Sequence, residues 1–487
     1  MRVTGVLAAV SSAKGDESMS AQAVQRPTVH VPHPTLSLWQ SAVHQTLLER
    51  QPKDGPSLSQ KADPYAVAIN NLAATRSILH ARMIDPAQTA TDEERLLGHA
   101  LATVQAQVKG HNRALNLDAA RDLIRRFSDQ DVEFVTSCVE NFIRYYIASK
   151  PQYRDWTQTE ENLEFGVVKY VLPADARLGV IGDWGTGLAD AEAMLTALIR
   201  KTRPTALIHL GDVYYSGTVE EVRNSFVGAI DRSCARAGVP RPPVFTIPGN
   251  HDYYSGGVGF YDSIEQLNAH DQRQQASYFC LRTADDWQFL GIDTGRYDHI
   301  PGLAFEPFYR APHLDRTDVT WVRDKLSKSG DLRTIMLSHH QLFSARSPLN
   351  GPLSFRDEYF NWDLKHSFED FFPKIALWLW GHEHSLALFR SGTLGVNKCR
   401  LLGCSAFELP AGDGYDPRFL EVAYDDPVVK LGMEQQWLNH GCAVIDMAEK
   451  VVDYFQFPSW GDSVPGDADL THLASEKILG GRIDKRY

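Results

Sequence analysis

"LIHLGDVYYSG", residues 207–217, begins as an apolar strand and ends in a glycine, an aspartate and two tyrosines. The Leu and Ile residues are typical of a strand that is buried on both faces. A turn needs only Gly211 and Asp212, because glycine reaches unusual backbone angles and aspartate bonds to its own backbone. The tyrosines that follow therefore indicate that this strand end has a chemical role.

Five other short runs between residues 177 and 380 are also continuously apolar. They are RLGVI (177–181), PVFTI (243–247), QFLGI (288–292), TIMLS (334–338) and IALWLW (375–380). Runs without polar alternation indicate strands covered on both faces, and the stretches between them favour helices. We therefore predict a layered α/β fold, in which ligands bind at the carboxyl ends of the strands.

Polar clusters follow five of the six runs and read GDWG, GDVYY, GNHD, SHH and GHEH. One such cluster alone would usually be a turn or contain a structural histidine. Five clusters, each at a strand end, instead predict a shared metal site. Carboxylate, amide and imidazole donors without a thiolate suit Fe, Mn or Zn, and the imidazoles are too many for a Ca²⁺ or Mg²⁺ site.

These motifs resemble those of the calcineurin-like metallophosphoesterases over residues 175 to about 455. That family combines an aspartate motif, GDxx, GNH[DE], a histidine after an apolar strand, and GHxH. Its usual first motif is DxH, whereas this chain has Asp183, Trp184 and Gly185 and so lacks that histidine. Purple acid phosphatases make the same departure and use a tyrosine three residues after the second aspartate. Tyr215 has that spacing from Asp212, and the chain is therefore similar to the small mammalian-type purple acid phosphatases.

The resemblance implies a layered αββα sandwich and a pair of metal ions. The first ion would be Fe(III), and the second would be Fe, Zn or Mn. The implied ligands are Asp183, Tyr215 and His384 for the first ion, Asn250, His339 and His382 for the second, and Asp212 for both. Tyr214 would pack or line the cleft, although a shift of one residue in the turn would exchange the two tyrosines.

The implied activity is a phosphomonoesterase of acid phosphatase type that attacks a small phosphate ester with metal-bound hydroxide. His251, beside Asn250, would protonate the leaving group, with Asp252 orienting it or capping the turn. His340 would face the substrate. Plant-type purple acid phosphatases carry another substrate-facing histidine about ten residues beyond the strand ligand, whereas this chain has none between His340 and His366. With one proton donor fewer, substrates with activated leaving groups should be favoured.

Two alternatives remain open at this stage. A phosphodiesterase acting on nucleotides or lipid head groups would use the same metal chemistry. A non-catalytic scaffold of the same fold would bind a protein through the N-terminal region, but such scaffolds lose ligands that this chain keeps.

Other polar residues near the strand ends are expected to be structural. Asp293 and Glu408 would support the site indirectly, and His209 and His440 would pack in the core or at its edge. Arg310, Arg346 and Arg356 lie in long loops that would form the rim of a cleft.

The predicted domains follow the changes in composition along the chain. Residues 1–34 are expected to be a disordered or extended tail, 35–165 an all-helical domain, 166–460 the catalytic domain and 461–487 a C-terminal tail. The helical domain shows 3.6-residue periodicity but no catalytic cluster, so we expect a packing or partner-binding role for it.

The composition excludes several classes of protein. A formal net charge of −12 without a dense basic run argues against binding to a nucleic acid backbone. No apolar run approaches the ~18 residues of a membrane helix. The six scattered cysteines form no CxxC pair and are expected to be free thiols. We expect a cytoplasmic protein, with export as the less favoured alternative, because the apolar stretch near the N-terminus is too short for a typical signal peptide.

Overall fold

The computed structural model describes residues 153–487 except 188, 215, 299–310, 346–348, 350–358, 407–428, 435–436, 459–467 and 486–487. Within these residues, two seven-stranded sheets and one two-stranded ribbon form the framework. The predicted all-helical domain lies outside the described residues, apart from 153–165. That short part contains two 3-10 helices, η4 (Trp156–Gln158) and η5 (Asn162–Glu164).

The first sheet has the strand order β1-β5-β6-β7-β8-β10-β9. Its strands are β1 (Val167–Leu172), β5 (Phe279–Thr283), β6 (Trp287–Ile292), β7 (Arg333–Ser338), β8 (Ile375–Trp380), β9 (Leu386–Leu388) and β10 (Cys399–Leu402). Strands β6, β7 and β8 are parallel neighbours, β5 runs parallel to β1 and antiparallel to β6, and β9 runs antiparallel to β10.

The second sheet has the order β16-β15-β14-β13-β2-β3-β4. Its strands are β2 (Arg177–Ile181), β3 (Ala206–His209), β4 (Val244–Thr246), β13 (His440–Asp446), β14 (Val451–Phe457), β15 (Thr471–Lys477) and β16 (Asp484–Lys485), while β11 (Met433–Glu434) and β12 (Trp437–Leu438) form the ribbon. Strands β2, β3 and β4 are parallel, and the others pair antiparallel.

The C-terminal segment differs from our expectation. We predicted a tail over residues 461–487, but β15 pairs with β14 along its length and β16 extends the sheet. The sequence THLASEK of β15 is polar, and only Ala474 and Glu476 are buried in it. Such a strand lacks the apolar run that identified the central strands.

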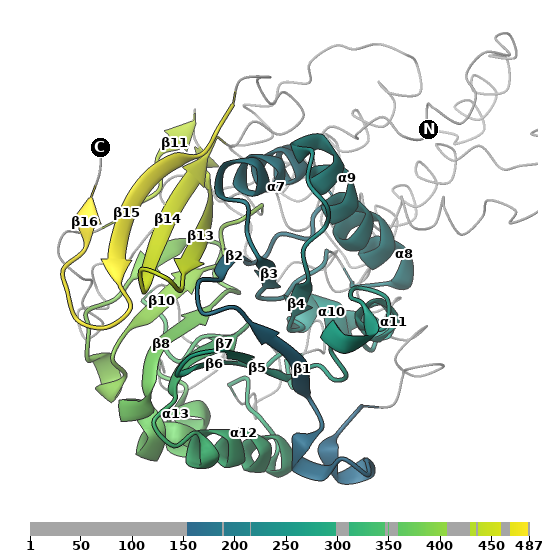
Figure 1. Cartoon of the computed structure of the whole chain (residues 1–487), viewed down its shortest axis with the longest axis vertical. Helices are drawn as coiled ribbons and strands as arrows, with labels where there is room; N and C mark the ends of the chain where they lie inside the picture. Colours follow the sequence, from purple (N-terminus) through teal and green to yellow (C-terminus); the bar gives the residue numbers. More distant parts are fainter. Residues whose placement is uncertain are drawn as a thin grey trace, which may run out of the picture. The chain divides into compact units, whose positions relative to one another are not determined.

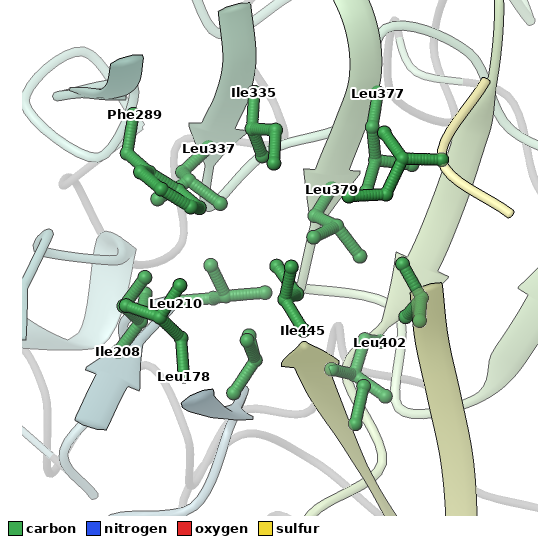
Figure 2. Packing of buried hydrophobic residues seen from close by; sticks show 14 of the residues in the cluster. Leu178, Ile208, Leu210, Phe289, Ile335, Leu337, Leu377, Leu379, Leu402 and Ile445 are labelled. Atoms are coloured by element: carbon green, nitrogen blue, oxygen red, sulfur yellow. The ribbon is translucent and has the colours of Figure 1, made fainter. Parts of the chain in front are cut away.

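The two sheets pack face to face around one apolar core (Figure 2). Leu178 and Ile208 of the second sheet meet Phe289, Leu337 and Leu379 of the first in this core. The burial of both faces explains why these strands read as unbroken apolar runs.

Helices cover the outer face of each sheet (Figure 1). On the second sheet lie α7 (Ala189–Thr202), α8 (Val219–Glu221), the π-helix η6 (Val222–Val227), α9 (Gly228–Ala237), α10 (Asn250–Tyr254) and α11 (Val258–Ile264), and on the first lie α12 (Arg316–Lys328) and α13 (Trp362–Phe368). The short 3-10 helices η7 (His270–Gln272), η9 (Glu369–Lys374) and η10 (Thr393–Gly395) lie in connections. These mixed α/β sheets with helices on both outer faces agree with the predicted fold class. None of the helices in the described ranges has the length and apolar character needed to cross a membrane.

The topology brings two sets of parallel strand ends to one place. Strands β2, β3 and β4 end beside one another in the second sheet, and β7 and β8 do so in the first. Direct contacts join the two sets: the backbone N–H of His382, after β8, donates to Asp183 Oδ2, after β2, over 2.9 Å. The predicted ligands therefore meet where the edges of both sheets come together.

Candidate metal centre

The backbone is strained at three of the predicted ligands. Asp183, Asp212 and His382 have φ values of 54°, 70° and 68°, in the left-handed region that side chains other than glycine rarely adopt. Such strain concentrates at functional sites, where the surrounding structure enforces it.

Glycines of the motifs make room for the two carboxylates. A Cβ atom on Gly249 would lie 2.0 Å from Asp212 Oδ1, and one on Gly381 would lie 2.5 Å from Asp183 Oδ2. Neither position could hold a larger residue without moving a carboxylate. The glycines before Asn250 and His382 are therefore part of the site.

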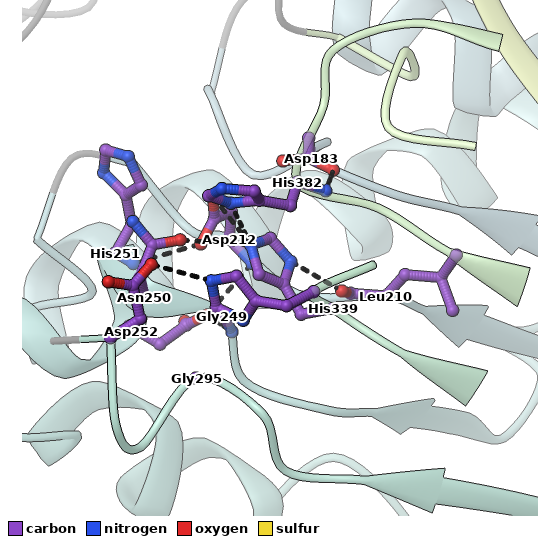
Figure 3. A network of polar contacts seen from close by, with 12 residues as sticks. Asp183, Leu210, Asp212, Gly249, Asn250, His251, Asp252, Gly295, His339 and His382 are labelled. Carbon is purple, nitrogen blue, oxygen red and sulfur yellow. Dashed lines mark hydrogen bonds and ion pairs between the residues drawn. The ribbon is translucent and has the colours of Figure 1, made fainter. Parts of the chain in front are cut away.

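One ring nitrogen of His339 faces Leu210 and the other faces the centre of the cluster (Figure 3). Its Nδ1 lies 2.9 Å from the backbone carbonyl oxygen of Leu210, which can only accept, so Nδ1 carries the proton. In a neutral ring Nε2 is then an acceptor. Nε2 lies 3.1 Å from Oδ1 of Asn250, 3.4 Å from Oδ2 of Asp212 and 3.2 Å from Nδ1 of His382; the amide oxygen is an acceptor, as is the carboxylate when it is ionised.

A second proton on the His339 ring would turn Nε2 into a donor, but the ring does not carry one. Burial and then the neighbouring His340 and His382 hold the pKa of His339 well below its usual range, so the ring is neutral. The amide nitrogen of Asn250 donates to the Tyr254 hydroxyl over 2.7 Å, and Oδ1 of the same amide lies on the side of His339. A bound cation would resolve the convergence. A ligating histidine that donates its other N–H to a backbone carbonyl is the usual arrangement at metal sites.

Asp212 lies at the middle of the site. Burial, followed by the charges of Asp183 and Asp252, raises its pKa well above the usual range for a carboxyl group. Its Oδ1 accepts from the backbone N–H of His251 over 3.1 Å. Asp252 supports both turns, because its Oδ2 accepts from the backbone N–H groups of Asp212 (3.0 Å) and Gly249 (2.8 Å). Burial raises the pKa of Asp252 to about 7.

Tyr214 contacts two predicted ligands of the first metal. Its hydroxyl lies 3.1 Å from Asp183 Oδ1 and 3.0 Å from His384 Nε2. The spacing from Asp212 predicts Tyr215 as the source of the phenol, and Tyr215 lies outside the described residues. An isolated β-bridge joins Gly185 and Val213, and the backbone N–H of Tyr214 donates to the Gly185 carbonyl oxygen over 3.0 Å.

His340 is held by two residues that the motifs did not reveal. Its Nδ1 lies 3.2 Å from Thr294 Oγ1, and its Nε2 lies 3.0 Å from Asp298 Oδ2. The ring centroid lies 4.3 Å from that of His382 and 4.7 Å from that of His339. Thr294 and Asp298 follow β6, the one apolar run for which we assigned no ligand.

The predicted residues gather in two overlapping groups. Ligand atoms lie within 4.8 Å of one another in the set Asp183, Asp212 and His339 and in the set His339, His340 and His382. Asn250 contacts His339, and His384 contacts Asp183 at 3.5 Å. His251 borders the cluster and is partly exposed. His382, like His339, has a pKa well below the usual range because of burial and then the adjacent His340.

The remaining predicted positions have varied outcomes. Asp293 is buried and accepts from the Tyr253 hydroxyl over 2.5 Å, in agreement with a supporting role. His209 is buried in β3, and His440 lies 3.0 Å from buried Asp190. Glu408 and the three loop arginines, Arg310, Arg346 and Arg356, lie outside the described residues.

A comparison with models of known protein families finds a match for part of this chain. A family model of calcineurin-like phosphoesterases matches residues 176–386. This region belongs to the calcineurin-like phosphoesterase family. The family consists of metal-dependent phosphoester hydrolases.

Two solved structures are similar at low sequence identity. One is a candidate 5′-nucleotidase from Staphylococcus aureus in complex with α-ketoglutarate, at 12% identity over 63% of this chain and 54% of that chain, with a TM-score of 0.30. The other is a Streptococcus pneumoniae protein described as a predicted phosphoesterase, at 9% identity over 61% of this chain and 97% of that chain, with a TM-score of 0.23. The chain thus spans about half the length of the first. No curated protein matched the chain.

Proposed function

We propose that the calcineurin-like region is a dinuclear phosphomonoesterase of purple acid phosphatase type. The observation that carries this proposal is the convergence of acceptor atoms at His339 Nε2 together with a tyrosine hydroxyl on Asp183. The first feature supports a cation, and the second supports a phenolate ligand in place of the missing DxH histidine.

The donor set fits two cations. Asp183, Tyr214 and His384 contact one another and would hold the first, for which we propose Fe(III). His339 contacts both Asn250 and His382, and these three residues would hold the second, which would be Fe, Zn or Mn. Asp212 lies against His339 and would serve both. When bound, such a pair supplies Lewis-acid activation of the phosphate ester and of the attacking water.

His251 is the proposed proton donor to the leaving group. Its backbone N–H is tied to Asp212, and its ring packs between Tyr214 and Tyr254 at centroid distances of 4.7 Å each. The ring is partly exposed, so a substrate could reach it. A positioned imidazole of this kind contributes about 10²–10⁴-fold to rate.

The contacts of His340 favour a structural role over the substrate-facing role that the sequence predicts. Both of its ring nitrogens have partners, Thr294 and Asp298, within 3.2 Å. The ring therefore supports a role in shaping the wall of the centre, and the proton is assigned to His251 alone. An ester with an activated leaving group needs this proton least.

The test compares two substrates on one metal-analysed sample. We expect the pure protein to bind two metal ions per chain and to hydrolyse p-nitrophenyl phosphate faster than bis(p-nitrophenyl) phosphate. Asp212→Asn should lose both metal and activity. Asp231→Asn, on the exposed side of α9, is the matched control and should keep both.

Each other outcome favours a named alternative. Faster hydrolysis of the bis-ester would replace the monoesterase with a phosphodiesterase. Two metal ions without hydrolysis of either ester would indicate a scaffold.

A further inference from the structure

Asp298 contacts the metal centre from outside every motif of the family. It lies six residues beyond the end of β6, and its Oδ2 is 3.0 Å from Nε2 of His340. The two residues are 42 positions apart in the chain. The aspartate side chain is about one fifth exposed, and the histidine is buried.

The hydrogen bonds of His340 define its orientation. A carboxylate only accepts, so Nε2 of His340 donates to Asp298. On the other side, Thr294 Oγ1 accepts from the backbone N–H of His340 over 2.9 Å, which leaves its hydroxyl hydrogen for Nδ1 at 3.2 Å. The ring is thus held at both nitrogens and cannot turn without breaking one of these bonds.

The ring held in this way packs on two proposed ligands of the second cation. His340 lies 4.3 Å from His382, at an interplanar angle of 45°, and 4.7 Å from His339, at 87°. His382 Nδ1 and His339 Nε2 are themselves 3.2 Å apart, pointing at the same space. A shift of the His340 ring would therefore change the spacing of these two nitrogens.

We propose that Asp298 is a positioning residue that fixes His340 and, through its ring, holds His339 and His382 at the spacing that the second cation needs. This inference deepens the proposed function and rests on it. Outer partners of ligating histidines commonly contribute about 10–100-fold to metal affinity. The effect should be confined to the second cation, because the proposed ligands of the first contact one another instead.

The base of the Asp298 loop has its own anchors. Arg296 Nη1 lies 2.8 Å from Asp315 Oδ2, and the Tyr297 hydroxyl donates to the same oxygen over 3.2 Å. Asp315 is also the N-cap of α12, accepting from the backbone N–H groups of Thr317 and Asp318. Because asparagine is an equally good N-cap, Asp315→Asn should weaken the loop anchor and keep the helix. This variant is therefore a control that distinguishes a general loosening of the loop from loss of the contact between Asp298 and His340.

The experiment is a Zn²⁺ titration of the metal-stripped full chain by calorimetry, with kcat and KM for p-nitrophenyl phosphate measured on the same samples. We expect Asp298→Ala to weaken the second Zn²⁺ by about 10–100-fold and leave the first unchanged. Its kcat should recover at saturating Zn²⁺. Asp298→Asn should restore most of the affinity, since its Oδ1 can accept from Nε2, and Asp315→Asn should titrate like wild type.

A double variant tests whether Asp298 acts through His340. In a His340→Ala background, Asp298→Ala should cause no additional loss, because contacting residues are not additive. Equal losses in both backgrounds would overturn the inference, as would an unchanged second Zn²⁺ in Asp298→Ala while wild type binds two. Wild type that binds no second ion would overturn the proposed function and this inference together.

Discussion

His339 Nε2 and Asn250 Oδ1 face each other at 3.1 Å with two lone pairs and no proton between them. The Leu210 carbonyl fixes the tautomer of the histidine, and the Asn250 amide nitrogen donates to the Tyr254 hydroxyl on the opposite side of the amide. Asp212 adds a third acceptor at 3.4 Å from the same nitrogen. A bound cation would satisfy these acceptors, and its removal should have measurable consequences.

Metal removal should lower both stability and activity. A ligand that binds only the folded state at 100 times its Kd stabilises it by about 2.7 kcal/mol. For a domain of this size, we expect chelation to lower Tm by about 5–10 °C and to abolish hydrolysis. Calorimetry before chelation, after it and after metal is restored measures this change. A Tm that does not respond to metal would contradict the cation site.

The tyrosine ligand can be identified with a matched pair of variants. Because the Tyr214 hydroxyl lies between Asp183 and His384, Tyr214→Phe should abolish the visible charge-transfer band of the iron-loaded protein. Tyr215→Phe is the control and should keep the band. Loss of the band in Tyr215→Phe but not in Tyr214→Phe would identify Tyr215 as the ligand, as its spacing from Asp212 predicts. A colourless iron-loaded wild type would show that no phenolate is bound.

His251 should affect turnover more than metal binding. It contacts Asp212 through its backbone N–H, which His251→Ala retains. We therefore expect kcat for a substrate with a poor leaving group, such as phenyl phosphate, to fall by about 10²–10⁴-fold while metal content stays at the wild-type value. The loss should be smaller for p-nitrophenyl phosphate. An equal loss on both substrates would argue against proton donation.

His209 predicts an acid sensitivity that is separate from the site. Burial lowers its pKa to about 3, whereas the unfolded chain takes up the proton near pH 6.5. Its contribution to stability is thus complete above that pH and declines as the pH falls from 6.5 toward 3. The slope is about 1.4 kcal/mol per pH unit.

Replacement of His209 should flatten this pH dependence. His209→Gln should show a shallower fall in the free energy of unfolding between pH 6.5 and 5, measured by urea denaturation of metal-stripped protein. His270→Gln, at an exposed position, should match wild type. Parallel curves for His209→Gln and wild type would mean that the buried imidazole does not govern the decline.

The central strands could be predicted because they are buried on both faces. Strands β2, β3, β4, β6, β7 and β8 coincide with the six apolar runs. By contrast, β15 presents a largely polar sequence at the side of its sheet, where a strand needs no continuous apolar run. The register of β15 is set by its pairing with β14, and the sequence of β15 alone does not specify that pairing.

The candidate site was predictable where ligands directly follow strands. Asp183, Asn250 and His382 lie in short motifs that combine a glycine with a donor side chain. Asp298 was not predictable, because its link to His340 depends on how β6 and β7 lie side by side. Spacing along the chain did not single out Tyr214, whose hydroxyl contacts Asp183 and His384.

The most direct test of the metal centre is anomalous diffraction from crystals of the metal-loaded protein. We predict two anomalous peaks about 3.5–4 Å apart, with Asp212 between them, Asp183 and His384 at one and Asn250, His339 and His382 at the other. A map with no peak inside this cluster, or with one metal bound elsewhere, would contradict the dinuclear site.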